Sequence, residues 1–153
     1  MDEALQGVSR VFLDTAPVIY YVEARAEFVP VVRPIFHMLD SGLLEGIASP
    51  VTLAECLVQP KRLGLVDLEQ GFSNLLTNSE GIVFVEIGEQ VGRLAAQMRS
   101  QYALRLPDAL QIATAIATNC QAFLTNDTQL TRITELRVLV VGDLEASESD
   151  EHS

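Results

Sequence analysis

The sequence predicts a single α/β domain built on a parallel five-stranded sheet flanked by helices. Five short apolar segments are separated by helical patterns rather than by hairpin turns. Strands that alternate with helices in this way form parallel sheets covered on both faces. The chain has 153 residues, 48% of them hydrophobic and 20% charged, which is the length and composition of one globular domain.

The first half of the chain is predicted to contain two strands and three helices. Residues 11–13 form a short strand that ends at Asp14, and a helix then runs to residue 24. Residues 29–41 have a helical apolar pattern that closes at a glycine. Residues 45–49 form the second strand, and the Ser49-Pro50 pair opens a helix to residue 60, because proline suits the first helical position.

The second half continues the alternation. An amphipathic helix (65–78), a third strand (81–87) and a further helix (88–103) lead into the most apolar part of the chain. There Pro107 opens a helix whose segment 109–117 carries no charge, so we expect it to be buried on most of its surface. A fourth strand (122–124), a polar turn, a short helix (128–133) and a last strand (137–141) complete the predicted sheet.

Residues 1–142 are predicted to form the domain, and residues 143–153 an acidic, disordered tail. The formal net charge is −11, from 21 acidic residues against 10 Lys and Arg, and five of the acidic residues lie in this tail. A general nucleic-acid-coating surface would normally be basic, so the charge argues against that class of protein. It weakens an RNA-binding hypothesis without excluding it.

The sequence is typical of a cytoplasmic protein with no membrane association. Cys56 and Cys120 lie in apolar helical context without metal-ligand spacing, which favours reduced thiols. The acidic N-terminal segment does not resemble a signal peptide. No apolar segment approaches the ~20 residues that are needed to span a bilayer.

Four acidic residues are the candidate functional residues: Asp14, Glu55, Asp108 and Asp127. Each has an ordinary interpretation alone, because acids are common at helix starts and in turns. Right-handed crossovers, however, place the carboxyl ends of all the parallel strands along one edge of the sheet. Asp14 and Asp127 follow strands, while Glu55 and Asp108 lie near helix starts, so all four could meet at that edge.

Clustered carboxylates repel one another, and a hard divalent cation removes that repulsion. Mg²⁺ or Mn²⁺ prefers oxygen ligands, and such a site best supports phosphoryl transfer. The sequence contains no Gly-rich phosphate loop, which argues against an enzyme that uses nucleoside triphosphates. The pattern therefore indicates metal-dependent phosphodiester chemistry.

Four segments contain the candidate acids: VFLDT with Asp14, TLAE with Glu55, LRLPDALQIATA with Asp108, and FLTND with Asp127. These segments resemble PIN-domain ribonucleases, and among these most closely the toxin subunits of VapBC-type toxin–antitoxin pairs. The resemblance implies a three-layer fold and an endoribonuclease whose four acids are both catalytic residues and ligands of Mg²⁺ or Mn²⁺. It further implies an RNA substrate, a small antitoxin protein as partner, and a homodimer. Thr15 and Thr125 match polar positions beside the metal site. Arg105, three residues before Asp108, is the base best placed to contact a phosphate, with a surface salt bridge as the alternative interpretation.

Three other classes of function remain to be considered. A non-catalytic module could keep the scaffold to bind RNA or protein, although loss of an acid would be its commonest mark and all four are present. A phosphoacceptor domain would need a lysine near the last strand, where the chain has only Arg137. An aspartyl phosphatase would have a second Asp two residues after Asp14, where Ala16 stands.

Overall fold

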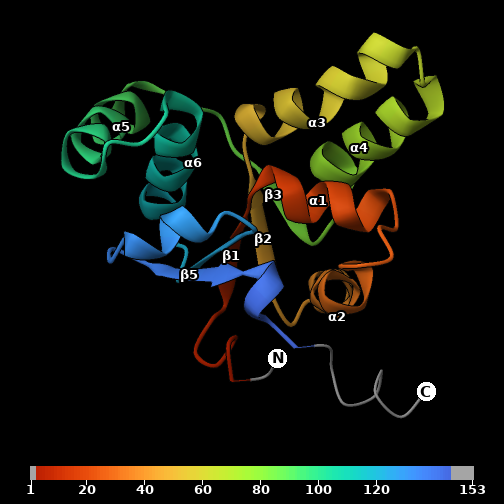
Figure 1. The fold of residues 1–153 in the computed structure, drawn as a ribbon, viewed down its shortest axis with the longest axis horizontal. Helices are drawn as coiled ribbons and strands as arrows, with labels where there is room; N and C mark the ends of the chain where they lie inside the picture. The colour runs from red at the N-terminus through yellow and green to blue at the C-terminus, as the bar shows by residue number, and fades with distance from the viewer. Residues whose placement is uncertain (1–2, 146–153) are drawn as a thin grey trace.

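The computed structural model describes residues 3–145 and has a fully parallel sheet in the order β3-β2-β1-β4-β5 (Figure 1). The strands are β1 (Arg10–Leu13), β2 (Glu45–Ala48), β3 (Ile82–Phe84), β4 (Ala122–Thr125) and β5 (Arg137–Val140). The helices are α1 (Thr15–Val22), α2 (Val29–Asp40), α3 (Pro50–Leu63), α4 (Val66–Asn78), α5 (Glu89–Tyr102) and α6 (Leu106–Ala117), with 3-10 helices η1 (Thr128–Arg132) and η2 (Val141–Asp143). The predicted α/β class with a five-stranded parallel sheet is confirmed.

Helices cover both faces of the sheet, which gives three layers. Along β1, Val11 and Leu13 pack into one apolar cluster with α1, α2, α3 and α4, whereas Phe12 packs into a second cluster with α5 and α6. This alternation follows from the two-residue period of a strand. The rings of Phe12 and Phe123 stack with centroids 5.2 Å apart, which joins the two central strands on the α5–α6 face. Figure 1 shows the two helical layers on opposite sides of the sheet.

Two elements end three residues away from their predicted ends, α3 later and β3 earlier. α3 continues through Pro60 to Leu63, and Gly64 ends it in the left-handed conformation with φ 66°. β3 ends at Phe84, although the apolar pattern continues to residue 87. Among residues 3–145, β3 is an edge strand that pairs with β2 alone. β2 ends at Ala48, just before α3 begins, so the segment after Phe84 has no strand beside it in this part of the chain.

The predicted tail lies mostly outside the described residues. The structure includes only its first three residues, of which Asp143 ends η2 and Leu144 packs against the first apolar cluster. None of the helices among residues 3–145 combines the length and the apolar character needed to cross a bilayer.

Candidate active site

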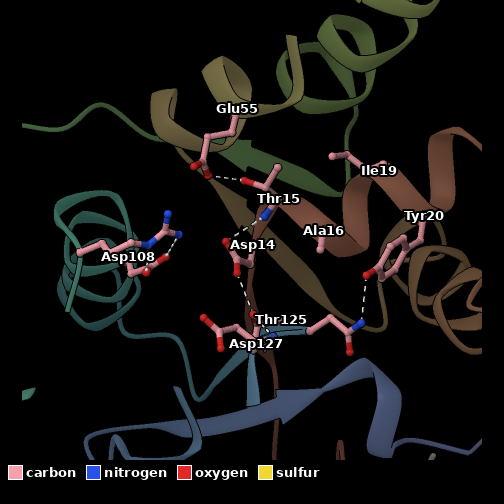
Figure 2. A pocket seen from close by; sticks show the side chains of 11 residues that line it. Asp14, Thr15, Ala16, Ile19, Tyr20, Glu55, Asp108, Thr125 and Asp127 are labelled. Atoms are coloured by element: carbon pink, nitrogen blue, oxygen red, sulfur yellow. Dashed lines mark hydrogen bonds and ion pairs between the residues drawn. The ribbon is translucent and has the colours of Figure 1, made fainter. Parts of the chain in front are cut away.

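A pocket of about 460 Å³ opens at the carboxyl edge of the sheet, between α1, α3, α6 and the segment after β4. All four predicted acids line it, together with Thr15, Arg105 and Thr125. Figure 2 shows Asp14 in the middle of the view, with Glu55, Asp108 and Asp127 around it. The predicted site residues therefore come together, from four separate parts of the chain.

Asp14 is fixed at the centre by its place between β1 and α1. It is the N-cap of α1, and its Oδ1 accepts a hydrogen bond from the Thr15 backbone N–H at 2.9 Å. Its Oδ2 accepts from Thr125 Oγ1 at 2.7 Å, and its own N–H donates to the Leu124 carbonyl at 3.0 Å. The N-cap of α1 is thus also one of the four predicted functional acids.

Glu55 and Asp108 approach from opposite helical layers, and each carboxylate has a polar partner. Thr15 Oγ1 donates to Glu55 Oε1 at 2.6 Å. The Arg105 guanidinium donates from Nε to Asp108 Oδ2 at 3.1 Å, with a second N–H reaching Oδ1 at 3.4 Å. The Arg105 side chain is 74% exposed and that of Asp108 only 17%, so the arginine covers this acid from the solvent side.

Asp127 is joined to Asp14 through one hydroxyl group. The Asp127 N–H donates to Thr125 Oγ1 at 3.1 Å, and the same hydroxyl donates to Asp14 Oδ2. Asp127 also caps η1, because its Oδ1 accepts from the Gln129 N–H at 3.0 Å. Thr125, at the end of β4 and fully buried, therefore links the acid that follows β1 to the acid that follows β4.

The electrostatics of the pocket centre on Asp14. Burial raises the pKa of its carboxyl above the ordinary value of 3.8, and the negative charges of Asp108 and Glu55 raise it further, against hydrogen bonds from Thr125 and Thr15 that lower it. The hydrogen bond to Asp108 raises the pKa of the Arg105 guanidinium, which therefore stays charged. The pocket holds more negative charge than its single base neutralises.

The chemistry of this donor set fits a hard divalent cation, because the pocket presents four carboxylates and no sulfur or imidazole ligand among its lining residues. The side chains are not drawn into one tight cluster, however. Within residues 3–145, no group of three or more His, Cys, Asp or Glu side chains is close enough to hold a metal ion. Glu55 and Asp108 are instead turned toward Thr15 and Arg105.

Four further lining residues had not been predicted: Ala16, Ile19, Tyr20 and Asn126. Ala16, Ile19 and Tyr20 form the α1 wall of the pocket, on the side away from Asp108 (Figure 2). Asn126 donates from Nδ2 to Tyr20 Oη at 2.9 Å and accepts from the Gly142 N–H at 2.9 Å. A polar residue between Thr125 and Asp127 was the available signal for Asn126, whereas the apolar positions of α1 look like ordinary core residues in the sequence.

The parallel sheet between two helical layers, with acids along its carboxyl edge, defines a three-layer α/β domain of PIN-like architecture. A family model described as "PIN domain" matches residues 11–136. The chain therefore belongs to the PIN domain family. A search of curated proteins finds no match.

Solved toxin–antitoxin structures share this fold at low sequence identity. A chain of VapBC2 from Rickettsia felis, bound to a promoter DNA fragment, has a TM-score of 0.69 and 15% identity over 86% of this chain and 98% of that chain. A toxin–antitoxin complex from Klebsiella pneumoniae gives 0.66 and 21%, over 86% and 97% of the two chains. VapC20 from Mycobacterium tuberculosis, a toxin that cleaves the sarcin–ricin loop, gives 0.61 and 12%, over 74% and 86%.

Proposed function

We propose that this protein is a metal-dependent endoribonuclease that hydrolyses RNA phosphodiester bonds. The proposal rests on one observation: four carboxylates line the same pocket, although they come from α3, α6 and the ends of β1 and β4. Membership of the PIN domain family supports it, as does the excess negative charge around Asp14.

Asp14, Glu55, Asp108 and Asp127 are the residues that would hold Mg²⁺ or Mn²⁺. When bound, such a cation supplies activation of a water molecule and neutralisation of the charge that develops on the phosphate. Thr15 and Thr125 orient the carboxylates of Glu55 and Asp14 through the hydrogen bonds described above. Arg105, exposed at the rim, would contact a phosphate of the RNA backbone.

Amide substitutions test this assignment. Asp14→Asn, Glu55→Gln and Asp108→Asn should each lower RNA cleavage by orders of magnitude while the protein stays folded. Asp127→Asn should have a smaller effect, because water can replace a ligand in a loop. The matched control is Asp67→Asn, which changes an exposed acid in the first turn of α4, outside the pocket.

Cleavage should require Mg²⁺ or Mn²⁺ and should stop in EDTA. Activity of the wild type that persists in EDTA would contradict the metal mechanism. The alternative, a non-catalytic PIN module that binds RNA or protein, is favoured by the absence of a tight ligand group among residues 3–145. RNA binding that needs no metal, without cleavage under any of these conditions, would support that alternative.

We further propose that the protein is the toxin of a toxin–antitoxin pair, that it acts in the cytoplasm, and that it forms a homodimer. The similarity of fold to the toxin–antitoxin structures supports this. An acidic pocket predicts that the antitoxin segment in it presents Arg or Lys.

Expression of the protein alone should slow bacterial growth, and co-expression of a small neighbouring reading frame should restore growth. Unimpaired growth at high soluble expression would contradict the toxin role. Sedimentation of the purified chain tests the dimer.

A further inference from the structure

A cluster of three buried polar side chains lies at the carboxyl edge of the sheet, outside the residues that line the pocket. Ser49, Thr52 and Gln111 are exposed by 0%, 0% and 1%, respectively. Buried polar groups are costly unless they are hydrogen-bonded, so a cluster of this kind in an apolar domain needs a physical reason. The proposed chemistry gives none of these three a role.

The hydroxyl of Thr52 is the centre of the cluster. It accepts hydrogen bonds from Gln111 Nε2 at 2.9 Å and from the Ser49 N–H at 3.4 Å, and it donates to the Leu13 carbonyl at 3.2 Å. Ser49 Oγ donates to Gln111 Oε1 at 2.6 Å and accepts from the Val51 N–H at 3.1 Å. One side chain of α6, the first turn of α3 and the last residue of β1 are thereby joined.

Each of the joined elements carries one acid close by. Leu13 directly precedes Asp14 in the chain. Thr52 lies three residues before Glu55 on α3, and Gln111 lies three residues after Asp108 on α6. Residues three apart in a helix occupy the same side of it, so the face of each helix that enters the cluster is also the face that carries its acid.

The cluster also joins two helices that belong to different layers. α3 packs with the first apolar cluster and α6 with the second. Within residues 3–145, the hydrogen bonds that connect α6 to α3 and its N-cap are the two made by Gln111. Apolar packing alone is non-directional and would allow small shifts between these helix ends.

We infer that the hydrogen-bonded unit of Thr52, Gln111 and Ser49 sets the spacing of Asp14, Glu55 and Asp108, so that Thr52 and Gln111 are positioning residues of the active site. The role of this hydrogen-bonded unit in catalysis rests on the proposed nuclease function. Its effect on the backbone at the three acids does not depend on that function. The two can therefore be tested separately.

Three variants isolate the central hydroxyl. Thr52→Val removes this hydroxyl and keeps the branched shape of the side chain, while Thr52→Ser keeps the hydroxyl. The matched control is Thr114→Val, because Thr114 is also fully buried and its hydroxyl donates within α6 to the Leu110 carbonyl at 2.7 Å, outside the cluster. Should Thr52→Val fail to fold, Gln111→Met and Ser49→Ala, which remove other bonds of the same unit, take its place in the comparison.

The first measurement uses the metal-free protein in EDTA and records backbone amide NMR shifts. Thr52→Val should move the amide signals at all three acids, residues 14, 55 and 108. Thr52→Ser and Thr114→Val should leave them near their wild-type positions. Because this measurement needs neither metal nor RNA, it remains decisive if the wild type proves to be no nuclease.

The second measurement concerns the loaded site. Thr52→Val should weaken Mn²⁺ binding and lower kcat by about 10-fold or more, which is the usual effect of removing a group that orients metal ligands. KM for RNA should change little, since substrate contacts are untouched, and Thr52→Ser should restore kcat. The inference is overturned if Thr52→Val matches Thr114→Val in amide shifts, Mn²⁺ affinity and kcat. Absence of both Mn²⁺ binding and cleavage in the wild type would instead overturn the proposed function, with the amide shifts still deciding the inference.

Discussion

Asp14 is the residue at which the structural and chemical demands on this chain meet. Its carboxylate caps α1 and accepts from Thr125, yet burial and the neighbouring charges of Asp108 and Glu55 raise its pKa. An acid whose pKa is raised by folding binds its proton more tightly in the folded state. Its contribution to stability is therefore complete below the ordinary pKa of 3.8 and is lost as the pH rises through the raised value.

The direction of this pKa shift predicts how Asp14→Asn changes thermal stability in the absence of metal. At neutral pH the amide removes a charge that opposes folding, so the melting temperature should rise. The advantage should shrink as the pH falls and vanish below about pH 3.8. Thermal unfolding of both proteins in EDTA across this pH range gives the measurement.

Addition of Mn²⁺ should reverse the order of the two melting temperatures, because the wild type gains binding free energy by mass action and the variant gains less. If Asp14→Asn melts lower than the wild type in EDTA at neutral pH, the N-cap and Thr125 contacts outweigh the charge, and the electrostatic account of this residue is wrong.

Arg105 should matter for the substrate rather than for stability. Its side chain is 74% exposed, and exposed ion pairs contribute little to folding. Arg105→Gln should leave the melting temperature almost unchanged, raise KM for RNA, and reduce the slope of log affinity against log salt by about 1. Arg93→Gln is the control, because the Arg93 side chain is about as exposed as that of Arg105, at 78%, and pairs with Glu89 away from the pocket. Equal effects of the two substitutions on KM would exclude a specific phosphate contact at Arg105.

The acids and their shared edge could be predicted at the residue scale, because strand-end and helix-start positions are visible in the sequence. Thr15, Thr125 and Arg105 were also predicted as supporting residues, but which acid each of them contacts was not. The bond between Thr125 and Asp14 joins residues that are 111 positions apart and follows from the pairing of β1 with β4. Gln111 is the one polar amide in the uncharged segment 109–117, which marks it as unusual, but its partners Ser49 and Thr52 depend on how two helical layers meet.

At the scale of elements, the strands and helices could be predicted by type, and their ends less well. The predicted helix ended at residue 60, yet α3 runs on to Leu63, because Gly64 supplies the stop and Pro60 is tolerated inside the helix. β3 is shorter than its apolar pattern because β2, its neighbour in the sheet, ends at Ala48 and α3 follows. Both differences come from what lies next to the segment, which a local pattern does not contain.

Gly81 is an element-scale constraint that predicts a large effect. It precedes β3 and lies against the C-terminal part of α2, where an added Cβ would approach the Leu39 carbonyl oxygen to within 2.2 Å. Gly81→Ala should therefore lower the free energy of unfolding by about 1–3 kcal/mol or more, because backbone atoms rather than a flexible side chain must move. Chemical denaturation measures the change.

Gly92→Ala is the matched control with the opposite expected sign. Gly92 is exposed within α5, and an added Cβ there meets nothing within 4 Å. Alanine in a helix interior is more stable than glycine by roughly 0.5–1 kcal/mol, so this variant should be more stable than the wild type. A Gly81→Ala protein as stable as Gly92→Ala would show that the approach of β3 to α2 is easily relaxed.

At the scale of the whole molecule, the net charge of −11 opposes the approach of RNA. Residues 146–153 carry three of the acids and no Lys or Arg. Deleting them should increase the association rate with RNA at low salt, and the difference should fade near physiological ionic strength, where the Debye length is ~8 Å. Stopped-flow binding of the full and shortened chains at several salt concentrations measures this. A deletion that slows association, or that unfolds the domain, would assign the segment a different role.

The order of the elements along the chain has a consequence for synthesis on the ribosome. The central strand β1 is made first, but its neighbour β4 is made more than a hundred residues later. Asp108 and Asp127, half of the acids in the pocket, also belong to the last third of the chain. A growing polypeptide therefore lacks one neighbour of its central strand, and a complete set of carboxylates, until β4 and Asp127 have left the exit tunnel. The nuclease activity proposed above would therefore be absent from a chain that is still being translated.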